Sequence, residues 1–150
     1  MRMVLPGVRT RRSIDQRLSG FFQTHREADF RHAMGRLSRF YRLPAPRVEW
    51  FEYLDWGKTA GRCCENGTLL LMHPEAWKRG RKYHSERRWI NMIYHELGHY
   101  VLWADPERKA DVFASRFVRG VQARKRCGTR RIASLSRPRL RRRRRRSRSR

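Results

Sequence analysis

The chain has few cysteines and no long apolar run, and these two shortages limit the classes of protein to which it can belong. Three cysteines among 150 residues are too few, and odd in number, for a disulfide-stapled secreted domain. Apolar runs such as Leu69-Leu70-Leu71-Met72 are far shorter than the roughly 18 residues that cross a bilayer. The N-terminus also lacks an apolar segment of signal-peptide length. We therefore expect an intracellular protein with no membrane partner, located in the cytoplasm, nucleoid or nucleus, or packaged in a virion.

Acidic residues are missing from the last part of the chain. Residues 119–150 hold 16 of the 38 lysines and arginines and none of the 13 acids, so 22 − 13 leaves +9 of the total charge of +25 on residues 1–118. Ten of the last fourteen residues are arginine. Such a segment cannot bury enough apolar surface to order itself. We predict a folded domain over residues 13–126, preceded by a basic leader, 1–12, and followed by a disordered tail, 127–150.

The arginine run in this tail predicts a polyanionic partner. Arginine is always ionised and pairs with phosphate in a bidentate manner. We therefore expect the tail to bind DNA or RNA without reading sequence and with steep salt dependence. The six consecutive arginines at its centre are Arg141, Arg142, Arg143, Arg144, Arg145 and Arg146.

Apolar periodicity predicts an α+β fold with helices at both ends of the domain. A helical pattern runs from Ser13 to about Pro44 and is broken either at Gly20 or within residues 23–29. Residues 47–54 read as a strand. Residues 61–64 and 68–73 flank Asn66-Gly67, a strong hairpin signal. These segments predict an N-terminal helix and a three-stranded antiparallel sheet.

Two further helices follow the predicted sheet. The first spans about residues 85–103, and the second begins at Asp105-Pro106, where Asp can cap a helix and Pro suits its first position. The apolar face of the first consists of Ile90, Ile93, Tyr94, Leu97 and Val101. That of the second consists of Ala110, Phe113, Ala114, Phe117, Val118 and Val121.

The first of these helices carries the pentapeptide His95-Glu96-Leu97-Gly98-His99. Two histidines four apart on a helix project from one face and can bind one Zn²⁺ at about 2.0–2.1 Å. The intervening glutamate then acts as general base toward the water that zinc polarises. Gly98 allows another element to approach the helix closely beside the site. The motif predicts a zincin-type metallohydrolase with one catalytic zinc ion.

A catalytic zinc needs a third protein ligand and an open position for water. Three acids follow the motif closely: Asp105, Glu107 and Asp111. Asp105 lies ten residues after His95, the spacing of the third ligand in metzincins, but Leu102 stands where those enzymes need glycine. His73 and His84 are more remote alternatives for the third ligand, or for a fourth that would close the site to water.

The segment Glu107-Arg108-Lys109-Ala110-Asp111-Val112-Phe113-Ala114 resembles the Glu-x-x-Ala-Asp/Asn-x-Phe-Ala segment that follows the histidine pair in gluzincins. Residues 85–118 are most similar to ImmA/IrrE-type metallopeptidases and less so to SprT-like proteins. The resemblance implies that Glu107 is the third ligand and that Asp111 supports a ligand histidine. The chain departs from the family pattern in the short connection of seven residues between His99 and Glu107.

These features lead to the prediction of a zinc metallopeptidase that acts on proteins associated with nucleic acid. In zincins the substrate pairs with an edge strand ahead of the active-site helix, and residues 68–73 are the candidate for that strand. The alternative is a non-enzymatic nucleic-acid-binding protein, such as a virion or regulatory component, whose zinc is structural or whose site is inert.

Overall fold

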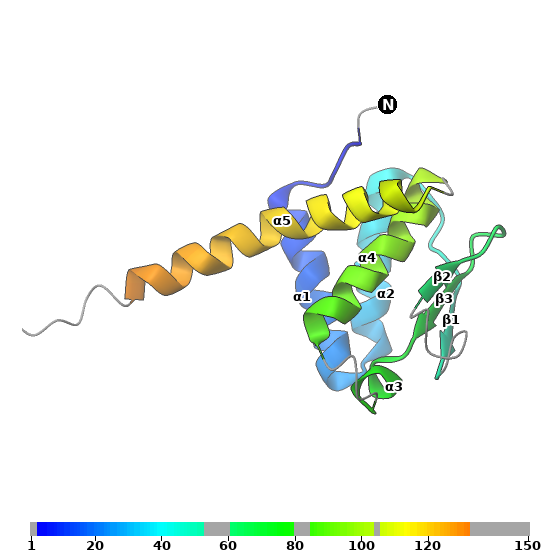
Figure 1. Cartoon of the computed structure of the whole chain (residues 1–150), viewed down its shortest axis with the longest axis horizontal. Coiled ribbons are helices and arrows are strands. Elements are labelled where there is room, and N and C mark those ends of the chain that lie inside the picture. Colours follow the sequence, from blue (N-terminus) through cyan, green and yellow to red (C-terminus); the bar gives the residue numbers. More distant parts are fainter. Residues whose placement is uncertain (1–2, 53–60, 80–84, 104–105, 133–150) are drawn as a thin grey trace, which may run out of the picture.

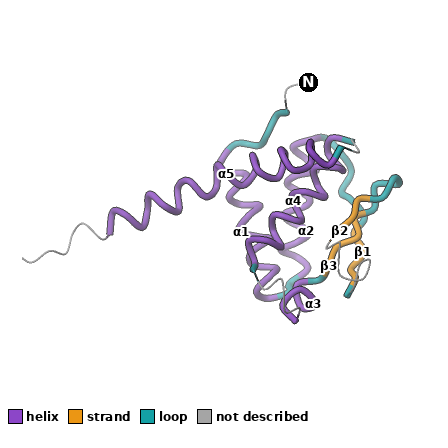
Figure 2. The backbone as a smooth tube through the Cα atoms, viewed as in Figure 1, coloured by secondary structure: helices purple, strands orange, loops and turns teal. Residues whose placement is uncertain are grey.

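A computed structural model describes residues 3–52, 61–79, 85–103 and 106–132; beyond Arg119, the side chain of Val121 alone is described. The fold is α+β, as predicted, with helices predominating and a small sheet lying to one side of them (Figures 1 and 2). The tail from residue 133 onward, including Arg141–Arg146, lies outside the described residues.

The N-terminal helical region consists of two helices, α1 (Val8–Thr24) and α2 (Glu27–Tyr41). The break between them lies within residues 23–29, the second of the two predicted positions. His25 ends α1 in the left-handed conformation, with φ of 57°, and its N–H donates to the Phe21 carbonyl. Both helices bury one apolar face, which packs in the core.

Helix α1 begins earlier than the sequence predicts. Its first residue is Val8, so the predicted start at Ser13 is wrong and residues 8–12 belong to the helix instead of a loose leader. Gly7 precedes the helix without a side-chain cap, which is why the local signal is weak. The added turn is held by Arg11, whose guanidinium donates to the carbonyls of Arg116 and Phe117 at 2.9 and 3.2 Å.

The sheet is mixed, with strand order β1-β3-β2. Strand β1 (Val48–Phe51) is parallel to β3 (Leu69–Met72), and β2 (Gly61–Cys63) is antiparallel to it. The predicted all-antiparallel sheet is therefore wrong, because β1 pairs with β3 and not with its neighbour in sequence. The prediction of an edge strand at residues 68–73 is wrong for the same reason, since β3 has a partner on each side. Strand β2 lies at an edge.

The β2–β3 hairpin forms at the predicted turn. Cys64 N–H donates to the Thr68 carbonyl at 2.8 Å, and Gly67 N–H donates to the Cys64 carbonyl at 2.9 Å. Gly67 has φ of 79°, whereas Asn66 instead uses its side-chain oxygen to accept from the Thr68 N–H. One residue of the predicted Asn-Gly pair thus supplies the backbone conformation and the other a side-chain bond.

A short helix, α3 (Pro74–Arg79), follows β3 where the sequence predicts only the end of a strand. Pro74 suits a first helical position because it needs no backbone donor there. Six residues are too few for a helical period to show in the sequence.

Helices α4 (Glu86–Leu102) and α5 (Glu107–Ile132) match the two predicted helices closely. Of the predicted apolar faces, Val101 is half-buried and every other residue is buried. Helix α5 continues past the predicted domain boundary at residue 126, and its C-terminal half projects beyond the other helices (Figure 1). Within the described residues, no helix is long and apolar enough to cross a membrane.

Candidate metal centre

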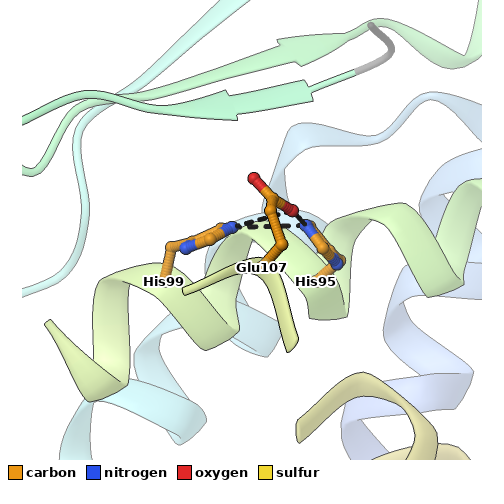
Figure 3. A group of neighbouring side chains, drawn as sticks. All are labelled: His95, His99 and Glu107. Carbon is orange, nitrogen blue, oxygen red and sulfur yellow. Dashed lines mark hydrogen bonds and ion pairs between the residues drawn. The ribbon is translucent and has the colours of Figure 1, made fainter. Parts of the chain in front are cut away.

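Helix α4 presents His95 and His99 on one face, one turn apart. Their ring centroids are 4.9 Å apart, and the two Nε2 atoms face each other at 3.2 Å. The rings are anchored on a helix whose opposite face is fully buried, with Ile93 and Leu97 both at 0% exposure. The histidine pair is therefore held by a rigid element of the core (Figure 3).

Glu107, the first residue of α5, completes the group. Its Oε2 lies 2.9 Å from His95 Nε2 and 3.6 Å from His99 Nε2. Ligands about 2.0–2.1 Å from a tetrahedral zinc ion lie roughly 3.3 Å from one another, so these separations suit a single ion. Within the described part of the chain, His95, His99 and Glu107 are the residues that converge in this way. Figure 3 shows the three side chains pointing toward one another.

Asp111 lies one turn further along α5 and contacts the other nitrogen of His95. Its Oδ1 is 2.9 Å from Nδ1 of that ring. Because an ionised carboxylate only accepts hydrogen bonds, Asp111 can accept the proton of Nδ1 in the tautomer whose Nε2 is free to bind a metal. A carboxylate on the far nitrogen is the usual arrangement behind a metal-binding histidine.

Glu96 lies on a different side of α4, against strand β2. Its side chain is buried, and the backbone N–H of Cys63 donates to its carboxylate. Burial raises the pKa of the Glu96 carboxyl above its ordinary value, and the neighbouring His95 and His99 rings oppose that shift. The carboxylate is thereby held beside the histidine pair but outside the converging group.

The two helices approach each other very closely at Gly98. A Cβ at this position would lie 3.0 Å from Ala110 Cα and 3.2 Å from Phe113 Cβ. Glycine therefore allows the close approach that the sequence predicts. It also explains how the short connection from His99 to Glu107 suffices, because α5 can lie directly on α4 where the ligands must meet.

Two of the other predicted ligands, Asp111 and His73, do not join this group. Asp111 contacts the far nitrogen of His95, as described above. His73 belongs to a separate cluster, where its ring lies 5.4 Å from those of both Trp50 and His25. It is therefore neither the third ligand nor a fourth. Asp105 and His84 lie outside the described residues.

Strand β2 is the part of the site that the sequence does not predict. A Cβ on Gly61 would lie 2.7 Å from both Glu96 Cγ and Met92 Sδ, so the strand rests directly on α4. In the ladder with β3, Cys64 bonds Thr68, and alternate residues of an antiparallel edge strand direct their backbone groups outward. Gly61 and Cys63 are those residues. The signal for this contact is weak, consisting of one glycine at the start of a short strand.

Comparisons with known proteins leave this arrangement to be interpreted from its own chemistry. No protein-family model, curated protein or solved structure matches the chain.

Proposed function

We propose that the protein is a zinc-dependent metallopeptidase in which His95, His99 and Glu107 hold the metal. The observation that carries this proposal is the convergence of three ligand atoms within 4.8 Å of one another. Two imidazoles and one carboxylate, with one position left for water, are a donor set typical of catalytic zinc. Zinc bound there would supply Lewis acidity and lower the pKa of water toward about 7.

Glu96 is the proposed general base. It follows His95 directly, and the Cys63 N–H fixes one side of its carboxylate. In peptide hydrolysis, the carboxylate takes a proton from the attacking water as the carbon–oxygen bond forms. It then returns the proton to the leaving amine as the carbon–nitrogen bond breaks. Asp111 keeps the ring of His95 in the tautomer and orientation that a metal ligand requires.

The edge of β2 that pairs with no strand of the described residues is the proposed site for the substrate backbone. An extended peptide can add to an exposed strand edge through main-chain hydrogen bonds. Next to Glu96, Gly61 offers its outward-directed N–H and carbonyl, and Cys63 offers its carbonyl, since the Cys63 N–H already donates to Glu96. A peptide there would lie alongside the histidine pair with a carbonyl near the proposed base. In this proposal β2 takes the substrate-binding role predicted for residues 68–73.

The Arg-rich tail adds a proposed partner, DNA or RNA, to the peptide substrate. Ten of the last fourteen residues are arginine, and this favours sequence-independent binding to phosphates. The enzyme would then act on proteins that are already associated with nucleic acid. The same composition also favours the second candidate, a non-enzymatic nucleic-acid-binding protein with a structural or inert metal site.

The test combines zinc stoichiometry with peptide hydrolysis by the full chain. We expect one zinc per chain, and hydrolysis that is lost in a Glu96→Gln variant which still binds zinc. The matched control is Glu75→Gln, an exposed glutamate in the separate cluster around His73. A Glu96→Gln variant that cleaves as well as the parent would contradict the mechanism.

Deleting residues 133–150 separates the two candidate functions. Under the first, zinc binding and hydrolysis of a short peptide persist in the truncated chain, while binding to nucleic acid weakens. Under the second, neither the full chain nor the truncated chain hydrolyses peptides, and the truncation removes most of the binding to nucleic acid.

A further inference from the structure

A trough runs between α4 and α5, starting at the metal centre. Its volume is about 580 Å³, and His95 and Asp111 line one end of it. On α4 it continues past Met92 and Asn91, toward the start of that helix. Apart from His95 and Asp111, the residues that line the trough have no part in holding the metal.

The far side of the trough is a single stripe of α5. From Asp111 it passes Ala114, Ser115 and Val118, which recur at helical spacing, and it ends at Arg119. Eight residues of helix cover about 12 Å. On the α5 side, small or apolar side chains therefore line the middle of the trough, whereas the cationic side chain of Arg119 lies at its end.

Arg119 is suited to bind an anion in the trough. Its side chain is exposed, and no acidic side chain within the described ranges forms an ion pair with it. Helical side chains lean toward the N-terminus of their helix, so Arg119 leans toward the metal end. Asp111, the acid at that end, is paired with His95. Because eight residues of helix separate Asp111 from Arg119, the charge at the Arg119 end of the trough is positive.

The trough also adjoins the edge where we place the substrate backbone. Met92, which lines it, lies directly under Gly61 of β2, because a Cβ there would lie 2.7 Å from the methionine sulfur. Successive side chains of an extended peptide point to opposite sides. A peptide on the β2 edge would therefore direct alternate side chains toward α4 and the trough.

From these contacts we propose that the trough is a specificity subsite for a carboxylate-bearing residue of the substrate, and that Arg119 recognises the carboxylate. The apolar walls at Met92 and Val118 suit an aliphatic stem, and a guanidinium fork suits a planar carboxylate. The carboxylate has two sources, an Asp or Glu side chain or the C-terminus of a peptide. This proposal rests on the proposed function for the position of the substrate.

The experiment measures peptide binding and cleavage separately. Binding is measured with the full-length, zinc-loaded Glu96→Gln variant, and cleavage with the zinc-loaded parent. The probes are acetylated, amidated peptides that differ only by Glu or Gln at one position, which is scanned along the peptide. A Gln peptide with a free C-terminus tests the second source of the carboxylate. At one position, or with the free terminus, we expect about tenfold preference for the carboxylate.

Substitutions at Arg119 test whether this residue causes the preference for a carboxylate. Arg119→Glu should abolish the preference for Glu and favour Lys at the same position, and Arg119→Met, which keeps the stem, should abolish it without reversal. The control is Arg116→Glu, which makes the same charge change on an exposed residue of α5 that does not line the trough. All variants share the Arg-rich tail, so differences between them isolate the subsite.

The outcomes distinguish this proposal from the proposed function. Equal binding and cleavage of Glu and Gln peptides at every position, with no effect of the free terminus, would overturn the subsite and leave the peptidase intact. Charge-selective binding that depends on Arg119, without cleavage by the parent, would support the subsite and contradict the peptidase. Loss of the preference in Arg116→Glu as well would overturn the subsite in favour of a general field effect. Displacement of the peptide by a short RNA, in an Arg119-dependent and tail-independent manner, would also overturn it.

Discussion

Replacing Gly98 with alanine tests whether the close packing of α4 on α5 sets the position of Glu107. The added Cβ would lie 3.0 Å from Ala110 Cα, where comfortable carbon–carbon contacts are about 3.5–4.0 Å. The obstructing atom belongs to the backbone, so no side-chain rotation can relieve the overlap. Helix α5 must therefore move by about 0.5 Å, and Glu107, less than one turn away, moves with it.

Two opposing terms set the effect on stability. Overpacking a close contact costs about 1–3 kcal/mol, whereas alanine is favoured over glycine in a helix by about 1 kcal/mol. We therefore expect the free energy of unfolding of Gly98→Ala to fall by about 1 kcal/mol. The variant should also bind zinc less tightly, on the order of tenfold, because ligand sets tolerate displacements of only about 0.5 Å.

Gly35→Ala is the matched control, because Gly35 also lies within a helix but has nothing within 4 Å of its added Cβ. This variant should gain up to about 1 kcal/mol and keep its zinc affinity. Urea denaturation of the metal-free chains and competition with a chromophoric chelator measure the two quantities. If Gly98→Ala is stabilised as much as Gly35→Ala and binds zinc equally well, the argument from close packing is refuted.

Three further predictions concern polar contacts of the core and the site. Asp111→Ala should weaken zinc binding by about 10- to 100-fold, since it removes the carboxylate behind His95, and an unchanged chelator competition would contradict this. Asp15→Asn should cost about 3 kcal/mol in urea denaturation, because it leaves Arg87 without the buried carboxylate it contacts at 2.9 and 3.2 Å. Burial lowers the pKa of His73 below its ordinary value of 6.5, so the folded state favours the neutral ring. The contribution of this ring to the free energy of unfolding is therefore complete above pH 6.5 and is lost as pH falls below it. Between pH 7.5 and 5.5 the Tm of the parent should fall more than that of His73→Phe.

Helical periodicity made the ligand-bearing part of the site predictable. The spacing of His95 and His99 is a property of one helix, and the face of α5 from Ala110 to Val121 is a property of the next. Once the two apolar faces are buried against each other, the short connection restricts the positions that Glu107 can occupy. The two histidines were therefore predictable from local pattern, whereas the choice of Glu107 over Asp105 and Asp111 rested on the resemblance to gluzincins.

Strand pairing was harder to predict from the sequence, because it depends on segments that are distant in sequence. Residues 48–51 carry no local signal that chooses between a parallel partner at residues 69–72 and an antiparallel one at residues 61–63. The contact of Gly61 with Glu96 depends on that choice, and so does the identity of the free edge. The trough is a product of two helix surfaces, and no single periodic pattern describes it.

The short separation of the ligands has a consequence for the order of folding. His95, His99 and Glu107 lie within thirteen residues of one another, so bringing them together closes only a small loop. Contacts this local form early in folding compared with the long-range pairing of β1 and β3. An ion that binds the three ligands would therefore stabilise the folding transition state as well as the native state. Zinc should then accelerate refolding, and its effect should not be confined to slower unfolding.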